Sequence, residues 1–443
     1  MNCEKVRDVL IDYVKEELDE DTQKRVEEHL MICGECAREA HSTRRLLTAT
    51  QSAQEESIIN LANDIIRQGI TNRASDIHLQ AEPSHVLLRY RIDGVLHKER
   101  ELERNLWDPL FTRLAIMADL NVTERQLPQE GRICARHQYK DFDLRMSYVP
   151  SAAGGKIVMR ILDRAAVCLD FERLGLDAEN RQTVKSMTES PNGIVLVTGP
   201  TGSGKTTVLY SMLNQVDSER CNVVTIEDPV EYLFDRVTQI GINARAGVTF
   251  PRAIRAVLRQ DPDVIMVGEI RDRETVELSV QAALTGHLVM STLHAQTTCS
   301  AVQRLFDIGV EPFLLQSSLI GLLAVRLVRR VCPQCKEKTE LAETVRKRLE
   351  EWAPKMANDA FYRGAGCDQC RNTGYRGRIG AFEVMSVHQE LGSAIGDRPT
   401  ETELFQAATA AGMRTLFQDG MQKAADGITT VEEVMRVLAV TLG

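Results

Sequence analysis

Residues 199–207 have the residue types and spacing of a phosphate-binding loop. They read Gly199, Pro200, Thr201, Gly202, Ser203, Gly204, Lys205, Thr206 and Thr207. The apolar run at 193–198 predicts a buried strand before the loop, and 208–213 predicts a helix after it. Backbone N–H groups of such a loop hold nucleotide phosphates, while Lys205 would contact the β- and γ-phosphate oxygens and Thr206 would ligate Mg²⁺. The alternative is a tight turn that binds no ligand. The match at all four positions that the motif constrains, Gly199, Gly204, Lys205 and Thr206, disfavours it.

Carboxylates and histidines stand at the ends of further apolar runs downstream of this loop. These runs and their polar ends are 223–226 with Glu227, 263–268 with Glu269, and 288–293 with His287 and His294. Open α/β sheets bind ligands at the carboxyl ends of their parallel strands, so a carboxylate there could organise Mg²⁺ or the attacking water. A solvated strand end without chemistry is the alternative for any one carboxylate. Their repetition favours a nucleotide site.

Two Cys-x-x-Cys pairs indicate a structural metal site in the last third of the chain. They are Cys332 with Cys335 and Cys367 with Cys370. Four thiolates with this spacing and with Pro or Gly neighbours favour a closed tetrahedral Zn²⁺ site, in which no position remains for water. The segment 344–352 between the pairs is charged and helix-like, so the metal would staple a small insertion. Redox or disulfide use is the competing interpretation, which complete pairs in a reducing compartment disfavour.

A second cluster lies near the N-terminus, and its spacing indicates a His-Cys₃ zinc site. The candidate ligands are Cys3, His29, Cys33 and Cys36. A helix is predicted at 21–29, with Asp21 or Thr22 as its cap and the histidine in its last turn. The segment resembles the short zinc-binding module of anti-sigma factors, which implies regulation or partner docking. A helical hairpin with incidental cysteines is the alternative.

Length and composition predict several domains and exclude some classes of protein. The 443 residues are too many for one core and suggest about three or four domains, and 43% hydrophobic and 26% charged residues are ordinary for a soluble protein. The longest apolar candidate, 318–325, is stopped by Arg326, and the N-terminus lacks the pattern of a secretory signal. We therefore expect a cytoplasmic protein that could dock on a membrane machine. A net charge of −9 and a pI near 5.6 disfavour nucleic acid as a partner.

The ordered motifs between residues 53 and 443 resemble the secretion ATPase superfamily, specifically the ATPases that assemble type IV pili and type II secretion pseudopili. Besides the phosphate loop, the two histidines and the tetracysteine insertion, the matching segments are 74–78 (ASDIH), 89–94 (RYRIDG), 127–132 (LPQEGR), 225–232 (TIEDPVEY), 258–263 (LRQDPD) and 268–272 (GEIRD). The resemblance implies an α/β fold, with a RecA-like P-loop ATPase core preceded by a PAS-like α/β domain. It also implies ATP, Mg²⁺ and Zn²⁺ as cofactors.

The resemblance implies roles for individual residues as well. Glu227 and Glu269 would position or activate water, and His287 and His294 would form a histidine box that senses the γ-phosphate. The PAS-like domain would supply arginines that reach the nucleotide and stabilise charge in the transition state. The candidates are Arg89, Arg91 and Arg132. Arg89 and Arg91 could instead be exposed charges at alternating positions of a strand. We therefore predict that the three arginines as a group contact the nucleotide, without choosing one of them.

Composition and resemblance together predict the division of the chain. The segments are a zinc-binding helical module at 1–47, a polar linker at 48–57, the PAS-like domain at 58–162, the RecA-like core at 163–331, the tetracysteine insertion at 332–377 and a helical C-terminal part at 378–443. Assembly ATPases usually begin with a helical docking domain, and here the zinc module stands in its place. We predict that the module replaces that domain and binds a partner that the sequence does not identify.

The expected function is that of a homo-hexameric motor. It would hydrolyse ATP and move an inner-membrane platform protein, so that pilin-like subunits are added to a pilus or a type II secretion pseudopilus. Retraction motors of the superfamily lack the tetracysteine insertion, and the acidic balance disfavours DNA-transport relatives. The alternative is a regulatory ATP-binding switch whose zinc module binds a partner, which the complete set of phosphate-handling residues disfavours.

Overall fold

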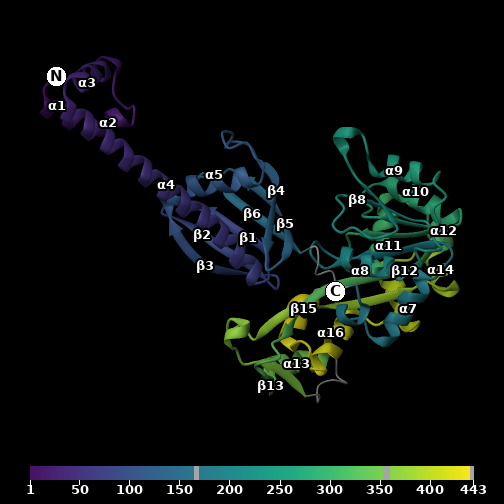
Figure 1. The fold of residues 1–443 in the computed structure, drawn as a ribbon. Helices are drawn as coiled ribbons and strands as arrows, with labels where there is room; N and C mark the ends of the chain where they lie inside the picture. The colour runs from purple at the N-terminus through teal and green to yellow at the C-terminus, as the bar shows by residue number, and fades with distance from the viewer. Residues whose placement is uncertain (164–168, 353–359, 440–443) are drawn as a thin grey trace. The chain divides into compact units, whose positions relative to one another are not determined.

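The structure, a computed structural model, describes residues 1–163, 169–352 and 360–439. Within these ranges it describes the side chains of all residues except 46–55, 348 and 350–352. The chain divides into two compact units, Met1–Ala165 and Ala166–Gly443 (Figure 1). Each unit has hydrophobic cores of its own. Residues 164–168 of the expected RecA-like core, 353–359 of the expected tetracysteine insertion and 440–443 of the expected C-terminal part lie outside the described residues.

Short helices and one long helix form the N-terminal part of the first unit: α1 (Cys3–Asp8), α2 (Leu10–Val14), α3 (Glu20–Ile32) and α4 (Gly34–Thr71). The N-cap of α3 is Asp19, whose carboxylate accepts the N–H of Thr22 at 3.0 Å. The predicted cap at Asp21 or Thr22 was wrong, because both residues already lie in the first turn. The core of this module consists of few residues, which is typical of domains that need a metal or another staple.

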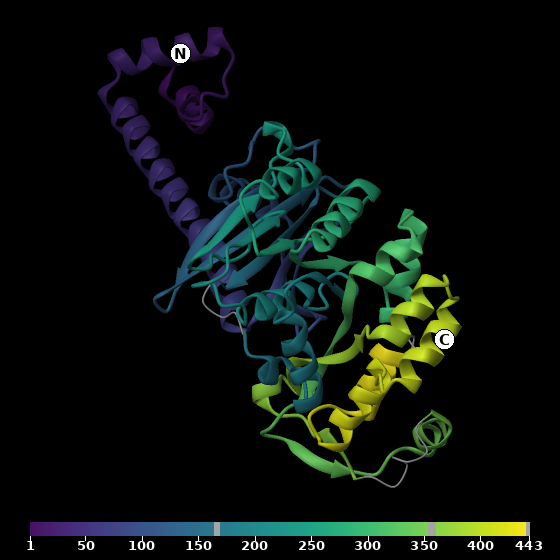
Figure 2. The same cartoon turned by 90° about the vertical axis from the view of Figure 1, so that its right-hand side faces the viewer.

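Helix α4 runs without a break from Gly34 to Thr71 (Figure 2). It includes 48–57, which the composition marks as a linker, and no Pro or Gly interrupts the chain between Gly34 and Gly69. Buried apolar residues of its second half, such as Ile65, belong to the core of the following α/β domain. One helix therefore joins the cysteine-bearing module to that domain.

The α/β domain of the first unit is built on an antiparallel sheet with the strand order β3-β2-β1-β6-β5-β4. Its elements are β1 (Ala74–Ala81), β2 (His85–Ile92), β3 (Val95–Glu103), η1 (Arg104–Leu106), α5 (Trp107–Met117), β4 (Gln129–His137), β5 (Lys140–Val149) and β6 (Lys156–Asp163). Alternate residues such as Ile77 and Leu79 are buried in a core shared with α4 and α5, and the intervening polar residues point to the other face. The expected PAS-like fold of this domain stays a prediction.

A seven-stranded sheet organises the second unit, in the order β15-β12-β7-β11-β10-β8-β9. Strands β12 to β9 are parallel, and β15 is antiparallel at one edge. The elements up to β12 are α6 (Phe171–Leu174), α7 (Ala178–Thr188), β7 (Gly193–Thr198), α8 (Lys205–Leu213), β8 (Val223–Glu227), β9 (Val237–Gly241), η2 (Ala244–Ala246), α9 (Phe250–Val257), β10 (Val264–Val267), α10 (Arg273–Leu284), β11 (Leu288–Leu293), α11 (Thr298–Ile308), α12 (Pro312–Ser318) and β12 (Leu319–Val331). The strands expected from the four apolar runs are confirmed, and helices cover both faces of the sheet.

The lobe that carries the four clustered cysteines and the C-terminal helices follow β12. Their elements are β13 (Lys336–Thr339), α13 (Glu343–Trp352), β14 (Phe361–Gly364), η4 (Asp368–Cys370), β15 (Tyr375–Ser386), α14 (Gln389–Gly396), α15 (Glu401–Ala410), α16 (Leu416–Ala425) and α17 (Val431–Leu438). Residues 319–325 of the apolar run at 318–325 form the largely buried first half of β12, and Ser318 ends α12. Among the described residues, no helix combines the length and the apolar character that a membrane crossing requires.

Candidate nucleotide site and metal centres

The phosphate loop begins directly after β7 and leads into α8. Gly199, Gly202 and Gly204 have φ angles of 150°, 77° and 95°, a backbone region that residues with a side chain rarely adopt. A Cβ at Gly199 would lie 2.5 Å from Ser203 Oγ and 2.6 Å from the carbonyl oxygen of Val325, so the space also requires glycine. The loop thus has the glycines it needs to turn tightly at a helix N-terminus, where phosphates bind.

The ammonium group of Lys205 lies inside this loop. Nζ donates to the carbonyl oxygens of Gly199 at 2.9 Å and Pro200 at 3.0 Å. Burial lowers the pKa of Lys205, the nearby carboxylate of Glu269 opposes that change, and the guanidinium of Arg326 adds to it. In the sequence, Arg326 is recognisable only as the charged residue that ends the apolar run at 318–325. Its place near the loop follows from the pairing of β12 with β7, which no local pattern specifies.

Strands β10 and β11 deliver a carboxylate and an imidazole to the same edge of the sheet. Glu269 Oε2 lies 3.6 Å from His294 Nε2, and Oε1 lies 2.5 Å from Arg271 Nη2. The hydroxyl of Thr198, at the end of β7, accepts the N–H of Ala295 at 2.9 Å and so ties the end of β11 to the start of the phosphate loop. Two of the predicted site residues therefore meet beside the loop.

His287 lies at the other end of β11. Its Nδ1–H donates to the carbonyl oxygen of Ala282 in α10 at 2.8 Å. With about 3.3 Å per residue along the strand, His287 and His294 are roughly 20 Å apart. Within one chain the structure brings His294 to the edge that carries the phosphate loop, and it does not bring His287 there.

Glu227, at the end of β8, is enclosed by hydrogen-bond donors. Its carboxylate accepts from Thr225 Oγ1 at 2.6 Å and from Gln239 Nε2 at 3.1 Å through Oε1, and from the hydroxyl of Tyr210 through Oε2. The residue is 3% exposed. It lies at the base of the segment 228–236, the acidic-box loop, which connects β8 to β9.

In the first unit, two of the candidate arginines share a row across the polar face of the sheet. Arg91 lies opposite Asp76, and Asp76 lies opposite Arg160 on β6. Arg160 faces Arg145 on β5, and Arg145 faces Arg132 on β4. Directly opposed residues point to the same face, so these five side chains form one line, the arginine row.

Asp76 is the acid within this row. Its carboxylate is buried, with Oδ1 3.1 Å from Arg160 Nε and Oδ2 3.7 Å from Arg91 Nε. Arg89, the remaining candidate, lies on the same face and donates to Gln80 Oε1 at 2.8 Å. Sequence reasoning missed two of the row's arginines. The polar–apolar alternation at 140–149 and 156–163 was the available signal, although the row itself depends on strand order.

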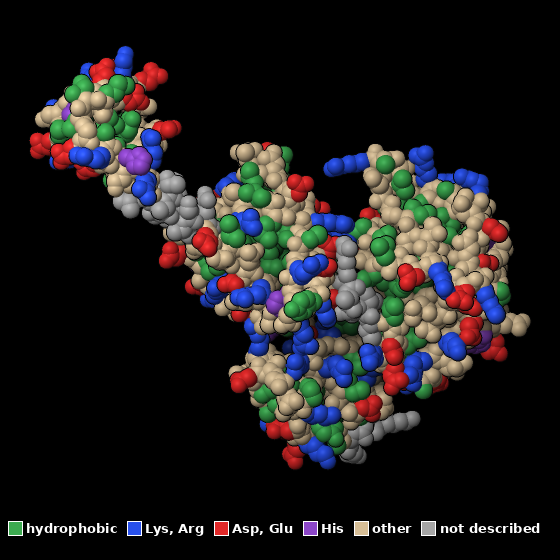
Figure 3. Space-filling view, in the orientation of Figure 1, with side chains coloured by type: hydrophobic (Ala, Val, Ile, Leu, Met, Phe, Trp, Pro, Cys, Tyr) green, Lys and Arg blue, Asp and Glu red, His purple; other side chains and the backbone are tan. Residues whose placement is uncertain are grey.

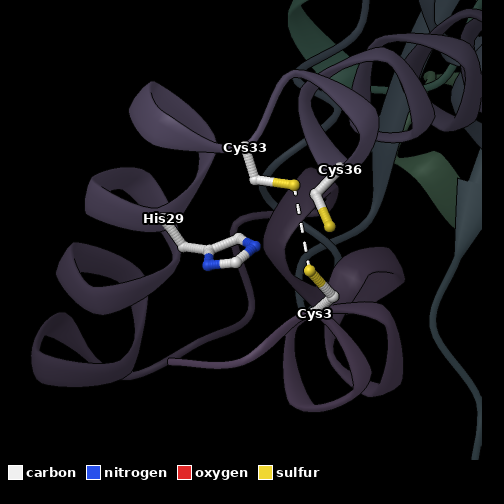
Figure 4. A group of neighbouring side chains, drawn as sticks. All are labelled: Cys3, His29, Cys33 and Cys36. Carbon is white, nitrogen blue, oxygen red and sulfur yellow. Dashed lines mark hydrogen bonds between the residues drawn. The ribbon is translucent and has the colours of Figure 1, made fainter.

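The four candidate metal ligands near the N-terminus come together from α1, α3, the junction between α3 and α4, and α4 (Figure 4). One ligand atom from each of Cys3, His29, Cys33 and Cys36 lies within 4.8 Å of the others. Cys3 Sγ and Cys33 Sγ are 3.8 Å apart, which is the separation expected of two thiolates on one tetrahedral Zn²⁺ with bonds of about 2.3 Å. The His29 ring donates from Nδ1 to the carbonyl oxygen of Met1 at 2.9 Å. Its Nε2 is buried and has no hydrogen-bond partner among the described residues, as a metal-binding nitrogen would.

The tetracysteine ligands converge in the same way. One sulfur from each of Cys332, Cys335, Cys367 and Cys370 lies within 4.8 Å of the others. The Sγ–Sγ distance is 3.8 Å between Cys332 and Cys367, 3.8 Å between Cys335 and Cys370, and 3.6 Å between Cys367 and Cys370. Four sulfurs complete a tetrahedral coordination shell, so these residues can hold Zn²⁺ in a closed, structural site.

Comparisons with known proteins agree with this arrangement. A family model described as Type II/IV secretion system protein matches residues 51–436, and a zinc-finger family model matches residues 3–37. The type II secretion system protein E of Pseudomonas aeruginosa is 44% identical over 389 residues, which is 87% of this chain and 76% of the relative. The type II secretion system ATPase E of Vibrio cholerae is 44% identical over 387 residues, with the same coverage of 87% and 76%.

Solved structures match over most of the chain as well. The crystal structure of the pilus retraction motor PilT with bound ADP has a TM-score of 0.58 at 27% identity, and the match covers 84% of this chain and 96% of that one. The ATPase DotB of Legionella pneumophila has a TM-score of 0.63 at 19% identity, covers 86% and 95%, and bears on the fold alone.

The parallel sheet, its phosphate loop, and the carboxylate and imidazole beside that loop define a P-loop ATPase. The predicted fold class is confirmed in its α/β sheets and ATPase core. The chain belongs to the Type II/IV secretion system protein family, and it carries a zinc-finger module before the family's ATPase.

Proposed function

We propose that the chain is a homo-hexameric motor that hydrolyses ATP to assemble a type II secretion pseudopilus or a type IV pilus at the inner membrane. The observation that carries this proposal is the meeting of Lys205, Glu269 and His294 at one edge of the parallel sheet. The 44% identity to the type II secretion system ATPase E of Vibrio cholerae favours assembly over retraction.

The chemistry divides among a few side chains. Lys205 and the loop N–H groups would bind the phosphates, and Thr206, which is exposed at the first turn of α8, would ligate Mg²⁺. Glu269 would orient the attacking water and take its proton while the bond from the γ-phosphorus to the bridging oxygen breaks. His294 is close enough to Glu269 to respond to the γ-phosphate. Glu227 would hold the acidic-box loop in place.

The arginine row would complete the site between subunits. An arginine in a phosphoryl-transfer site stabilises the charge that develops in the transition state, so its removal lowers the rate by several powers of ten. A row with four guanidinium groups and one carboxylate has the net positive charge that this role needs. This part of the proposal predicts that monomers hydrolyse ATP slowly.

The metal centres serve structure and docking. The tetracysteine site would hold its lobe against the ATPase core. The N-terminal zinc module would take the place of the usual docking domain and attach the motor to the membrane platform through a partner of its own. The motor would then work from the cytoplasm as a peripheral protein of the inner membrane.

Two other functions are less well supported. A regulatory ATP-binding switch would not need a carboxylate and an imidazole placed together beside the phosphate loop. DNA transport calls for a basic surface, whereas acidic and basic side chains lie interspersed on the face shown in Figure 3.

The decisive experiment measures Mg²⁺-dependent ATP hydrolysis against protein concentration, with the oligomer mass recorded in parallel. We expect the specific activity to rise as hexamers form and to vanish in Lys205→Ala. Nucleotide binding without turnover in every oligomeric state, with membranes added, would favour the regulatory switch. A variant that begins at residue 54 keeps the buried part of α4 and should lose membrane association; normal localisation and assembly by that variant would refute the docking role.

A further inference from the structure

Tyr210 connects the helix of the phosphate loop to the acidic box. It lies on α8, whose first residue is Lys205, and it is fully buried. Its hydroxyl donates to Glu227 Oε2 and accepts the backbone N–H of Glu231 at 3.3 Å. One hydroxyl therefore joins the helix, the end of β8 and the acidic-box loop.

Gln239 fastens the same loop from its other end. Its side chain on β9 donates to Glu227 Oε1 at 3.1 Å and to the carbonyl oxygen of Tyr232 at 2.8 Å, and it accepts the N–H of Phe234 at 2.7 Å. Glu227 thus lies between two side chains that each also bind the loop backbone. A carboxylate in this position organises the loop around it.

Aromatic packing adds to these polar contacts. The Tyr210 ring meets Tyr232 edge to face at 5.8 Å between centroids and Phe234 at 5.1 Å. Both partners belong to the acidic-box loop, so the loop packs on the phosphate-loop helix through tyrosine and phenylalanine rings.

Glu227 is poorly placed to accept a proton from water. Both of its oxygens accept hydrogen bonds and it is 3% exposed. Burial and the carboxylate raise the pKa of Tyr210, so the hydroxyl stays protonated and donates. The Glu269 carboxylate, by contrast, lies within electrostatic reach of Lys205.

We propose that Tyr210 is a positioning residue for ATP hydrolysis, which acts through Glu227 to fix the acidic-box loop against the phosphate-loop helix. Glu227 then contributes by holding Tyr210 and Gln239, and proton transfer falls to Glu269. A change in the position of α8 on nucleotide binding would reach the loop through this hydroxyl and through the ring that carries it. The inference rests on the proposed ATP hydrolysis and names how its acidic box works.

The first test compares steady-state ATP hydrolysis of the full chain with that of Tyr210→Phe, which keeps the ring and removes the hydroxyl. We expect kcat to fall roughly 10- to 100-fold with KM and ATP affinity within about twofold, because misplacement costs turnover more than binding. Glu227→Gln should lose a similar factor, and the double variant should lose no more than about threefold beyond either. Tyr148→Phe is the matched control, since it removes a buried hydroxyl that donates to a backbone carbonyl in the first unit.

The second test does not depend on activity. Trypsin cleaves after arginine, and Arg236 is an exposed arginine at the end of the acidic-box loop, where we expect local opening to govern the cleavage rate. We expect Tyr210→Phe and Gln239→Leu to be cut at least about fivefold faster there than the wild type and Tyr148→Phe. Two results would overturn the inference: wild-type kcat and cleavage in Tyr210→Phe, or rate losses that multiply in the double variant. If the wild type hydrolyses no ATP, the proposed function fails while the cleavage rates still decide this inference.

Discussion

His294 Nε2 lies 3.6 Å from Glu269 Oε2, and the two residues follow neighbouring parallel strands. The second oxygen of Glu269 is engaged by Arg271, so the carboxylate is held from two sides. Such a group is oriented before substrate arrives, which is what the activation of a bound water requires. The glutamate belongs to the predicted set, but its pairing with the imidazole emerges only from the order of the strands.

Replacing Glu269 with glutamine tests its role directly. We expect Glu269→Gln to bind ATP with unchanged affinity and to lose roughly two to four powers of ten in kcat, because the amide cannot take a proton from water. Turnover and binding of a fluorescent ATP analogue would be measured on the same preparation. Glu277→Gln, which alters an exposed carboxylate on α10, is the control, and a wild-type kcat in Glu269→Gln would remove this residue from the reaction.

The arginine row predicts which side chains of the first unit matter for turnover. We expect Arg132→Ala and Arg145→Ala each to lower kcat by at least about tenfold, since each removes positive charge from one line of side chains. Arg136→Ala should stay within about twofold, because Arg136 pairs with Asp141 at the end of the hairpin. Equal rates in all three variants would show that the row lies outside the nucleotide site.

Much of the second unit could be predicted because its signals are local. The strand expected at 193–198 is β7, Gly193–Thr198, since a fully buried parallel strand needs a continuous apolar run. Glu227 shows the limit of such reasoning. Its place at the end of an apolar run was visible in the sequence. Its enclosure was not, because the Tyr210 hydroxyl that binds it comes from α8 and the Gln239 amide from β9.

The same limit appears in the first unit. Periodicity marks Arg89 and Arg91 as members of one polar face, whereas the alignment of Arg132 with Arg145 requires the register of β4 and β5. Two residues close together in the sequence can also both fit the N-cap of the same helix. Asp19 and Asp21 are both good helix caps, and the extended backbone of Asp19 decides between them.

Metal content should distinguish the two cysteine clusters. We expect about two Zn²⁺ ions per wild-type chain and about one in Cys36→Ser, with the ATPase activity of the variant within about twofold of the wild type. Elemental analysis of the purified full chain measures the number of Zn²⁺ ions per chain in the wild type and the variant. Cys134→Ser should keep both ions because Cys134 lies outside either cluster, and a full zinc content in Cys36→Ser would show that the N-terminal group holds no metal.

The tetracysteine site should matter for stability more than for chemistry. Cys370→Ser leaves three sulfurs around the ion, so we expect the melting temperature of the second unit to fall by roughly 10 °C. Differential scanning calorimetry with and without added zinc would measure it. A redox site would behave differently, with wild-type stability in the reduced protein whether zinc is present or chelated.

His78 predicts a pH dependence of stability in the first unit. It is 7% exposed, and neither ring nitrogen has a hydrogen-bond partner among the described residues. Burial, together with the cations of Arg91, Lys156 and Arg89, lowers the pKa of His78 to about 4, although Asp76 opposes the change. An unfolded histidine has a pKa of about 6.5, so between these values the unfolded chain binds a proton that the folded chain does not. The free energy of unfolding is therefore highest above pH 6.5 and falls as the pH drops toward 4.

Chemical denaturation at pH 7 and pH 5 measures this loss, which should reach about 2 kcal/mol at pH 5. His78→Gln removes the titrating group and should flatten the pH dependence of the first unit by that amount, even if it changes the stability at pH 7. His85→Gln is the control, because His85 Nε2 lies 3.3 Å from a carboxylate oxygen of Glu82 and 3.5 Å from one of Glu101, and its replacement should leave the His78 contribution in place. An unchanged pH dependence in His78→Gln would mean that the folded domain accommodates the protonated ring, with the nearby carboxylate of Asp76 outweighing burial.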